Sequence, residues 1–190
     1  MKTKFTVLDL ALALPFAASA DVSYKYLDVN YQFGGDIDAG GASVDTDGFG
    51  IKASFPINDA WFATFDYNSL STDPSGLDIT DWALSGGWRN DMFFAKFGWE
   101  SAEFDFGPFG SLDDSGYNLD FGVRTMVSDA VELNGHVGYS DLGDLDTFTN
   151  YGFGAVWMFG DNMGASFNYD MRSGDGFDQT SMGLGLRVNF

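Results

Sequence analysis

The stretch TSMGLGLRVNF, residues Thr180–Phe190, indicates how the rest of the chain folds. Every second residue is apolar, which gives the set Met182, Leu184, Leu186, Val188 and Phe190. The residues between them are Ser181, Gly183, Gly185, Arg187 and Asn189. Successive side chains of a β-strand point to opposite faces, so this alternation predicts a strand with one apolar face, ending in an aromatic side chain.

The same alternation recurs along most of the chain, which at 190 residues is long enough for one domain. It predicts ten strands, near residues 22–33, 48–55, 60–68, 79–88, 92–100, 116–127, 131–139, 148–159, 163–172 and 180–190. Most of them have roughly the 9 to 11 residues that a tilted membrane-spanning strand needs. The expected fold is therefore all-β, a ten-stranded antiparallel up-and-down transmembrane β-barrel, with eight strands as the alternative if two segments are miscounted.

The segments between the predicted strands are of two kinds. Four short turns contain Asp59, Asp91, Asp129 and Asp161, which lie 32, 38 and 32 residues apart and mark an internal repeat of one hairpin plus one loop. Five longer segments, 34–47, 69–78, 101–115, 140–147 and 173–179, are rich in Gly, Ser, Asp and Thr. Outer-membrane barrels have this asymmetry, with short periplasmic turns and long extracellular loops.

The scarce basic residues indicate which face is inside. Apart from Lys25, those in the predicted strands share the polar face, and charge on a lipid-facing surface costs about 2–4 kcal/mol per Lys or Arg at the bilayer midplane. The apolar face is therefore expected to meet lipid, with aromatic belts at both interfaces. The predicted lumen polar network consists of Asp28, Lys52, Asp66, Asp81, Lys96, Glu100, Asp120, Arg124, Glu132, His136, Asp170, Arg172 and Arg187.

This interior has two competing interpretations. Positions along the strands predict a basic layer (Lys52, Lys96, Arg124, Arg187) beneath an acidic one (Asp81, Glu100, Asp120, Asp170). The favoured interpretation is a plug of mutually paired charges that makes a narrow barrel rigid, because buried charges must be paired. The alternative is a narrow, cation-preferring pore with an acidic outer mouth.

The acidic residues outside the lumen are concentrated in the five longer segments, which hold fifteen of them and no Lys or Arg. They could share divalent cations with lipopolysaccharide phosphates, since hard cations take carboxylate oxygens. The densest group, Asp141, Asp144 and Asp146, lacks the glycine and terminal Glu of a calcium loop. Ordinary surface solvation is favoured, and no metal or cofactor site is predicted.

The N-terminus has the features of a secretory signal peptide, which would span residues 1–20 and leave the barrel as 21–190. Lys2 and Lys4 precede an apolar run that Pro15 ends, and Ala18-Ser19-Ala20 is a small-residue cleavage site. Removing it leaves seven basic and 27 acidic residues, a net charge of about −20. Such a charge argues against a nucleic-acid partner, since binding requires Lys and Arg to neutralise phosphates.

Catalysis is not predicted. The chain has no cysteine and one histidine, His136, which shares the inward face with Glu132 and Asn134. Barrels that deacylate lipid A pair a lipid-facing His with a Ser two residues later, and here that position is Gly138. A histidine within the polar network is the better interpretation.

Several stretches resemble known families. The mature chain resembles the small OmpA/OmpX-type outer-membrane barrels over its whole length, and ALPFAASA (Ala13–Ala20), DVSYKYLDVNY (Asp21–Tyr31) and DGFGIKASFPINDAWFATFDYNS (Asp47–Ser69) are similar to short barrels of xanthomonad-type bacteria, often described as diffusible or quorum-related outer-membrane proteins. The resemblance implies a bacterial outer-membrane location and supplies no enzymatic residues. The expected partners are outer-membrane lipid, lipopolysaccharide and, through the strand that ends at Phe190, the barrel-assembly machinery.

Overall fold

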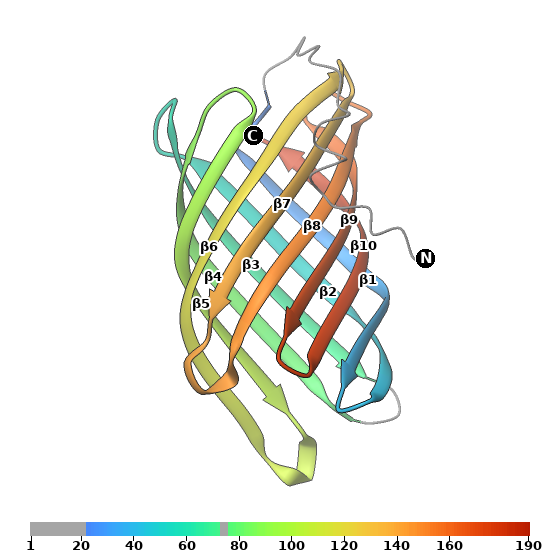
Figure 1. The fold of residues 1–190 in the computed structure, drawn as a ribbon. Helices are drawn as coiled ribbons and strands as arrows, with labels where there is room; N and C mark the ends of the chain where they lie inside the picture. The colour runs from blue at the N-terminus through green and yellow to red at the C-terminus, as the bar shows by residue number, and fades with distance from the viewer. Residues whose placement is uncertain (1–21, 73–75) are drawn as a thin grey trace, which may run out of the picture.

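The computed structural model describes residues 22–72 and 76–190, and within them the chain forms a closed β-barrel of ten antiparallel strands (Figure 1). The strands and two short 3-10 helices are β1 (Tyr26–Ala39), β2 (Ala42–Pro56), β3 (Trp61–Thr72), β4 (Asp78–Arg89), β5 (Phe93–Asp105), η1 (Gly107–Phe109), β6 (Ser111–Ser128), β7 (Val131–Asp141), η2 (Gly143–Leu145), β8 (Thr147–Met158), β9 (Met163–Gly174) and β10 (Phe177–Asn189). Each predicted strand overlaps one of these, so the prediction of ten strands is confirmed and the eight-stranded alternative is wrong. The proposed signal peptide lies outside the described residues.

Each strand pairs with its neighbour in sequence, and β1 closes the ring by pairing with β10, from Tyr26 opposite Asn189 to Ala39 opposite Phe177. Closure leaves no unpaired sheet edge, which a bilayer would not tolerate. In the described part of the chain, no helix has the length and hydrophobicity needed to cross a membrane.

The four predicted short turns all lie at one end of the barrel, which we call the turn end; we call the opposite end the hairpin end (Figure 1). Two of the turns use the same device. The side-chain oxygen of Asn58 accepts hydrogen bonds from the backbone N–H groups of Ala60 and Trp61, and that of Asn90 accepts from Met92 and Phe93. The asparagine side chain at each position therefore stabilises the tight turn between the two strands.

The five longer segments differ from the expectation of loops, because most of their residues continue the strands. Gly40 and Gly41 alone separate β1 from β2, both with positive φ (58° and 87°), as a two-residue hairpin turn requires. Asp175 and Gly176 alone separate β9 from β10. All strands except β7 have 12 to 18 residues, more than a tilted spanning strand needs, so the barrel wall extends beyond the membrane at the hairpin end. Figure 1 shows that the β5–β6 hairpin projects furthest.

Sidedness follows the predicted parity. Outward-facing aromatic side chains are exposed, among them Phe97 (61%), Trp157 (59%) and Phe121 (53%), whereas inward-facing Asp28 and Ser54 are completely buried. The larger apolar side chains that face inward form clusters at the two ends of the barrel. The interior is thus polar through the middle, the reverse of a soluble protein.

Strand pairing shows where the alternation of inward and outward side chains continues and where it shifts. β5 keeps one register with β4 and β6 up to Asp105, so the strand continues and Phe104 points inward without a bulge. One register shift lies in β6 between Met126 and Ser128, and another lies in β1 between Phe33 and Asp36, where Gly34 has a φ of 57°. After this bulge Ile37 turns inward, out of phase with Asp28 and Asn30.

Candidate functional site: the barrel interior

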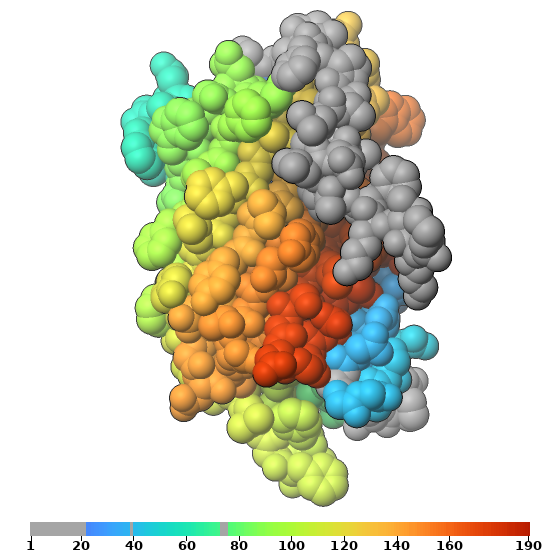
Figure 2. All heavy atoms as spheres, viewed as in Figure 1, coloured from blue at the N-terminus to red at the C-terminus, as the bar shows by residue number. Residues whose placement is uncertain are grey.

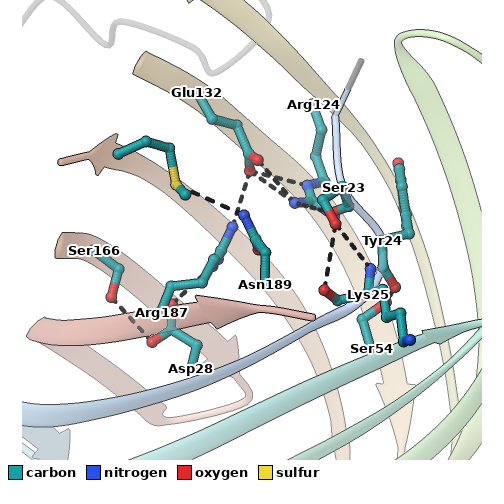
Figure 3. A network of polar contacts seen from close by, with 11 residues as sticks. Ser23, Tyr24, Lys25, Asp28, Ser54, Arg124, Glu132, Ser166, Arg187 and Asn189 are labelled. Atoms are coloured by element: carbon teal, nitrogen blue, oxygen red, sulfur yellow. Dashed lines mark hydrogen bonds and ion pairs between the residues drawn. The ribbon is translucent and has the colours of Figure 1, made fainter. Parts of the chain in front are cut away.

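The interior near the turn end holds a compact network of buried charges (Figure 3). Arg124 donates hydrogen bonds to both carboxylate oxygens of Glu132 at 2.9–3.0 Å, and Arg187 donates to Glu132 Oε1 at 3.2 Å. Arg187 Nε also donates to Asp28 Oδ2 at 3.0 Å, and Ser166 donates to the other Asp28 oxygen. Two guanidinium groups therefore share two carboxylates in a place where unpaired charge would be very costly.

Aromatic rings extend this network toward the turn end. The Arg89 and Arg124 guanidinium groups each lie 4.4 Å from the Tyr24 ring centroid, and Arg124 and Arg187 lie 5.0 and 4.1 Å from that of Tyr26. The result is an alternating arrangement of three arginines and two tyrosines. The segment before β1 is fixed by the same contacts, because Arg124 donates to the Ser23 carbonyl and Ser54 donates to that of Tyr24.

A second layer crosses the middle of the barrel. Lys96 Nζ lies 3.5 Å from Asp66 and 3.4 Å from Asp120, and Lys52 Nζ lies 3.6 Å from Asp170. His136 Nε2 lies 3.9 Å from the other oxygen of Asp170. Gly138 leaves room for this layer, since a Cβ there would lie 1.9 Å from Asp120 Oδ1.

A third layer lies toward the hairpin end. Arg172 pairs with Glu100, which also accepts a hydrogen bond from Ser140 at 2.7 Å. Asp81 accepts a hydrogen bond from Asn68 at 2.7 Å, and Asn68 in turn accepts one from Gln32.

All thirteen predicted lumen residues thus lie in one of these three layers, but the layers are not sorted by charge. Asp28 and Glu132 lie among the arginines near the turn end, and Arg172 lies among the acids near the hairpin end. The expectation of a basic layer beneath an acidic one is therefore wrong. Buried cations need nearby counter-charges, so acids and bases alternate instead of separating.

The middle layer divides the interior into two cavities. One, of about 160 Å³, lies on the hairpin side and reaches Asp81, Glu100 and Arg172; the other, of about 100 Å³, lies on the turn side and reaches Tyr24 and Arg187. Four residues line both cavities, namely Lys52, Asp66, Lys96 and His136. This layer is therefore the boundary between the two spaces.

Apolar side chains line the turn-side cavity at the turn end of the barrel. We call Val22, Tyr24, Phe62 and Met126, with Phe94 packed against them, the turn-end cluster. The Tyr24 and Phe62 ring centroids are 4.7 Å apart, and both rings line the cavity. Residues 22–24 were predicted to begin the first strand; they instead precede it and fill this end of the barrel.

A larger apolar group covers the hairpin-side cavity. We call it the hairpin-end cluster; it consists of Ile37, Leu70, Leu77, Ile79, Ala102, Phe104, Leu142, Leu145, Phe148 and Phe177. Phe104 and Phe177 join its two halves, with ring centroids 5.8 Å apart. The cluster draws on β1, β3, β4, β5, β8, β10 and the η2 turn, strands from opposite sides of the barrel mouth. Sequence reasoning missed it, although inward parity at Leu70, Ile79 and Phe104 was a usable signal.

The η2 turn belongs to this cluster. Leu142 is completely buried, and Asp114 of β6 anchors the turn by accepting a hydrogen bond from the Asp144 N–H at 2.7 Å. Hydrogen bonds from the Asp144 and Ser115 backbones hold the pKa of Asp114 below its ordinary value. Among the described residues, no group of three or more His, Asp or Glu side chains is arranged to hold a metal ion.

Comparison with known proteins identifies the kind of barrel. A family model described as "Outer membrane protein beta-barrel domain" matches residues 6–159. The chain belongs to this outer-membrane β-barrel family. Its location is the bacterial outer membrane, where short turns face the periplasm and long hairpins face outward, so the turn end is periplasmic and the hairpin end is extracellular.

One solved structure supports this fold at low sequence identity, and others are similar to the chain. The translocator domain of the autotransporter NalP from Neisseria meningitidis superposes with a TM-score of 0.54 at 12% identity, covering 91% of each chain. Ail of Yersinia pestis (TM-score 0.44, 13% identity, 87% of this chain and 97% of that one) and Neisserial surface protein A (0.47, 15%, 88% and 98%) are also similar. A search of curated protein sequences gives no significant match.

Proposed function

We propose that this outer-membrane barrel is a non-catalytic protein that contributes to envelope integrity and presents acidic extracellular hairpins for surface interactions. One observation carries the proposal: the ion-paired interior lies between two apolar clusters, one at each end of the barrel. Water and ions cross apolar constrictions poorly, and charges that are already paired offer little to a passing ion. The arrangement supports the rigid plug over the open tube.

The non-catalytic part of the proposal rests on His136. Its nearest charged partner is Asp170, and both line the cavity on the hairpin side. A lipid acyl chain outside the barrel has no direct approach to an inward side chain. We expect His136→Ala to leave lipid A acylation in cells unchanged; altered acylation would contradict this part.

A narrow cation-preferring pore remains the second candidate, because Asp81 lies in the larger cavity with an amide, Asn68, as its hydrogen-bond partner. Planar-bilayer recordings separate the two candidates. The plug predicts no discrete conductance steps from the purified barrel. Cation-selective steps that weaken in Asp81→Asn/Asp120→Asn, but not in Asp59→Asn/Asp161→Asn in the exposed periplasmic turns, would establish the pore and overturn the plug.

Envelope integrity is tested in cells. We expect that deleting the protein increases sensitivity to detergent and to large antibiotics, and that the wild-type chain restores resistance. Glu132→Gln should restore it less well, because it leaves Arg124 and Arg187 without their shared carboxylate, at a cost of about 3–5 kcal/mol. The matched control is Asp91→Asn, which removes the same charge in an exposed turn. Unchanged sensitivity in the deletion strain would contradict the proposal.

The similarity of Asp21–Tyr31 and Asp47–Ser69 to xanthomonad-type barrels supports membership of that narrower group. We propose no signalling role, since a described diffusible activity indicates little about what a membrane-embedded barrel does. Lipid and lipopolysaccharide around the wall, the assembly machinery at the β10 strand, and divalent cations at the acidic hairpins complete the proposed partners.

A further inference from the structure

Two extracellular turns of this protein have the same backbone. In η1, Phe106 N donates to Gly110 O (2.9 Å), Phe109 N to Phe106 O (3.3 Å) and Gly110 N to Gly107 O (3.2 Å). In η2, the corresponding bonds run from Leu142 N to Asp146 O (3.0 Å), Leu145 N to Leu142 O (3.2 Å) and Asp146 N to Gly143 O (3.4 Å). The sequences are DFGPFG (residues 105–110) and DLGDLD (residues 141–146), with an apolar residue at the second and fifth positions of each.

Dihedral angles and side-chain bonds repeat as well. Gly107 and Gly143 have φ values of 61° and 62°, and the N–H of each donates a hydrogen bond to the side chain of the aspartate two residues earlier (2.8 and 3.2 Å). The last residues, Gly110 and Asp146, have φ values of 98° and 104°. The two turns are thus one rigid structural unit used twice.

The apolar residues of the two turns differ in solvent exposure. Leu142 is completely buried in the hairpin-end cluster, and Leu145 packs against the same cluster. In η1, Phe109 is 92% exposed and Phe106 is 39% exposed, and Leu112 beside them is 58% exposed. Figure 2 shows that this tip stands clear of the barrel body. A bonded turn that holds aromatic side chains out in water avoids most of the ordering cost of binding, and aromatic side chains are frequent centres of interfaces.

We propose that the tip of the β5–β6 hairpin, formed by Phe106, Phe109 and Leu112, docks into an apolar pocket bordered by lysine or arginine on a partner protein. The proposal deepens the proposed function and rests on it, since it names where the surface interaction occurs. Charge selects the partner: the strands beneath the tip carry Glu103 directly opposite Asp113, and Asp105 opposite Asp78. Residues 101–115 contain no Lys or Arg.

The same charges disfavour other occupants. Anionic lipid would be repelled by the carboxylates that flank the aromatic rings. A second copy would bring the same acidic strands together, and Arg172, the basic residue of the described hairpin-end strands, already pairs with Glu100. A cationic protein surface would be bound both by contact with the apolar tip and by attraction to the carboxylates around it.

Binding to defined probes tests the proposal. The protein is reconstituted in nanodiscs of zwitterionic lipid, and anisotropy is measured with a fluorescent amphipathic leucine–lysine peptide, with a leucine–glutamate peptide and empty nanodiscs as references. Wild type should bind the lysine peptide alone, and Phe106→Ser/Phe109→Ser should weaken that binding at least about tenfold. Glu103→Gln/Asp113→Asn should weaken it several-fold and reduce its salt dependence. The matched control Asp38→Asn/Asp45→Asn makes the same charge change on the β1–β2 hairpin and should have a smaller effect.

The outcomes separate the two proposals. Unchanged affinity in Phe106→Ser/Phe109→Ser would overturn the docking tip while leaving a charge-driven surface interaction intact. A wild-type protein that binds neither peptide would overturn the surface interaction itself. Phenylalanine-dependent binding to protein-free zwitterionic vesicles, or phenylalanine-dependent dimers in analytical ultracentrifugation, would overturn the protein partner. Heat-modifiable migration on gels verifies that each variant is folded.

Discussion

The η1 and η2 turns share a backbone and differ in what their apolar side chains touch. η2 folds over the extracellular mouth and places Leu142 in the barrel interior, where Asp114 anchors it. η1 sits on a longer hairpin, and its Phe109 reaches solvent. We infer from the comparison that strand length helps to decide whether this unit closes the barrel or presents an exposed surface, because β5 and β6 carry the turn away from the mouth.

The largest expected difference between the turns is in stability. Leu142→Ala should lower the free energy of unfolding by about 2–5 kcal/mol, because the completely buried side chain leaves a cavity. Phe106→Ala, the equivalent change in η1, should lower it by no more than about 1 kcal/mol. Urea titration of the refolded protein in micelles, followed by tryptophan emission, measures both. Equal losses would show that η1 packs as η2 does.

A smaller effect is expected at the last position of each turn, where the backbone is left-handed in both. Gly110→Ala should cost about 1 kcal/mol through the backbone alone, since an added Cβ at this φ of 98° meets nothing within 4 Å. Asp146→Gly relieves the same strain but loses the hydrogen bond from Thr147 N (2.7 Å), so its gain should be smaller. Hydrogen exchange at the Phe106 and Leu142 amides reports each turn separately. A stabilising Gly110→Ala would contradict the shared geometry.

The two turns also differ at the fourth residue of their six-residue sequences, where a smaller effect is expected. Pro108 in η1 corresponds to Asp144 in η2, whose N–H donates to Asp114. Asp144→Pro removes this donor and should speed hydrogen exchange in η2 by about tenfold, the equivalent of one net hydrogen bond. The global unfolding midpoint should change less than in Leu142→Ala. Unaltered exchange would mean that the apolar contacts of Leu142 alone hold the turn.

The smallest expected effect is a pH dependence. Because the pKa of Asp114 is lowered in the folded protein, its contribution to stability is present above the ordinary carboxyl pKa of about 3.9 and is lost as pH falls through the lowered value. Acid should therefore loosen η2 in wild type before it affects η1, and Asp114→Asn should remove that difference. Hydrogen exchange at the Asp144 amide between neutral and acidic pH provides the measurement. A pH response that persists in Asp114→Asn would assign it to another group.

Several features of the fold could be predicted from local sequence. Alternation at Thr180–Phe190 and in nine other segments gives the strands, and the position of residues such as Lys96 and Arg124 within it gives the inward face. The signal is strong because a one-residue error would place charge in lipid. Asparagine and aspartate at the short turns give the connections for an equally local reason.

The ion pairs of the interior could not be predicted from local sequence. Arg187 and Asp28 are 159 residues apart in sequence but face each other because β10 closes on β1, and Glu132 reaches both Arg124 and Arg187 from β7. These partners depend on the register and tilt of every strand between them. Sorting the charges by height along each strand ignored that stagger, which is why it predicted separate layers.

By itself the sequence determined a ten-stranded barrel with a polar, charged interior and acidic outer segments, because the period of two and the cost of charge in lipid act residue by residue. Only the tertiary structure decided how that interior is divided, covered at both ends and paired, because closing the ring brings distant side chains together across the lumen. It also decided that one copy of a repeated turn is buried and the other exposed. That difference depends on how far each hairpin rises above the barrel mouth.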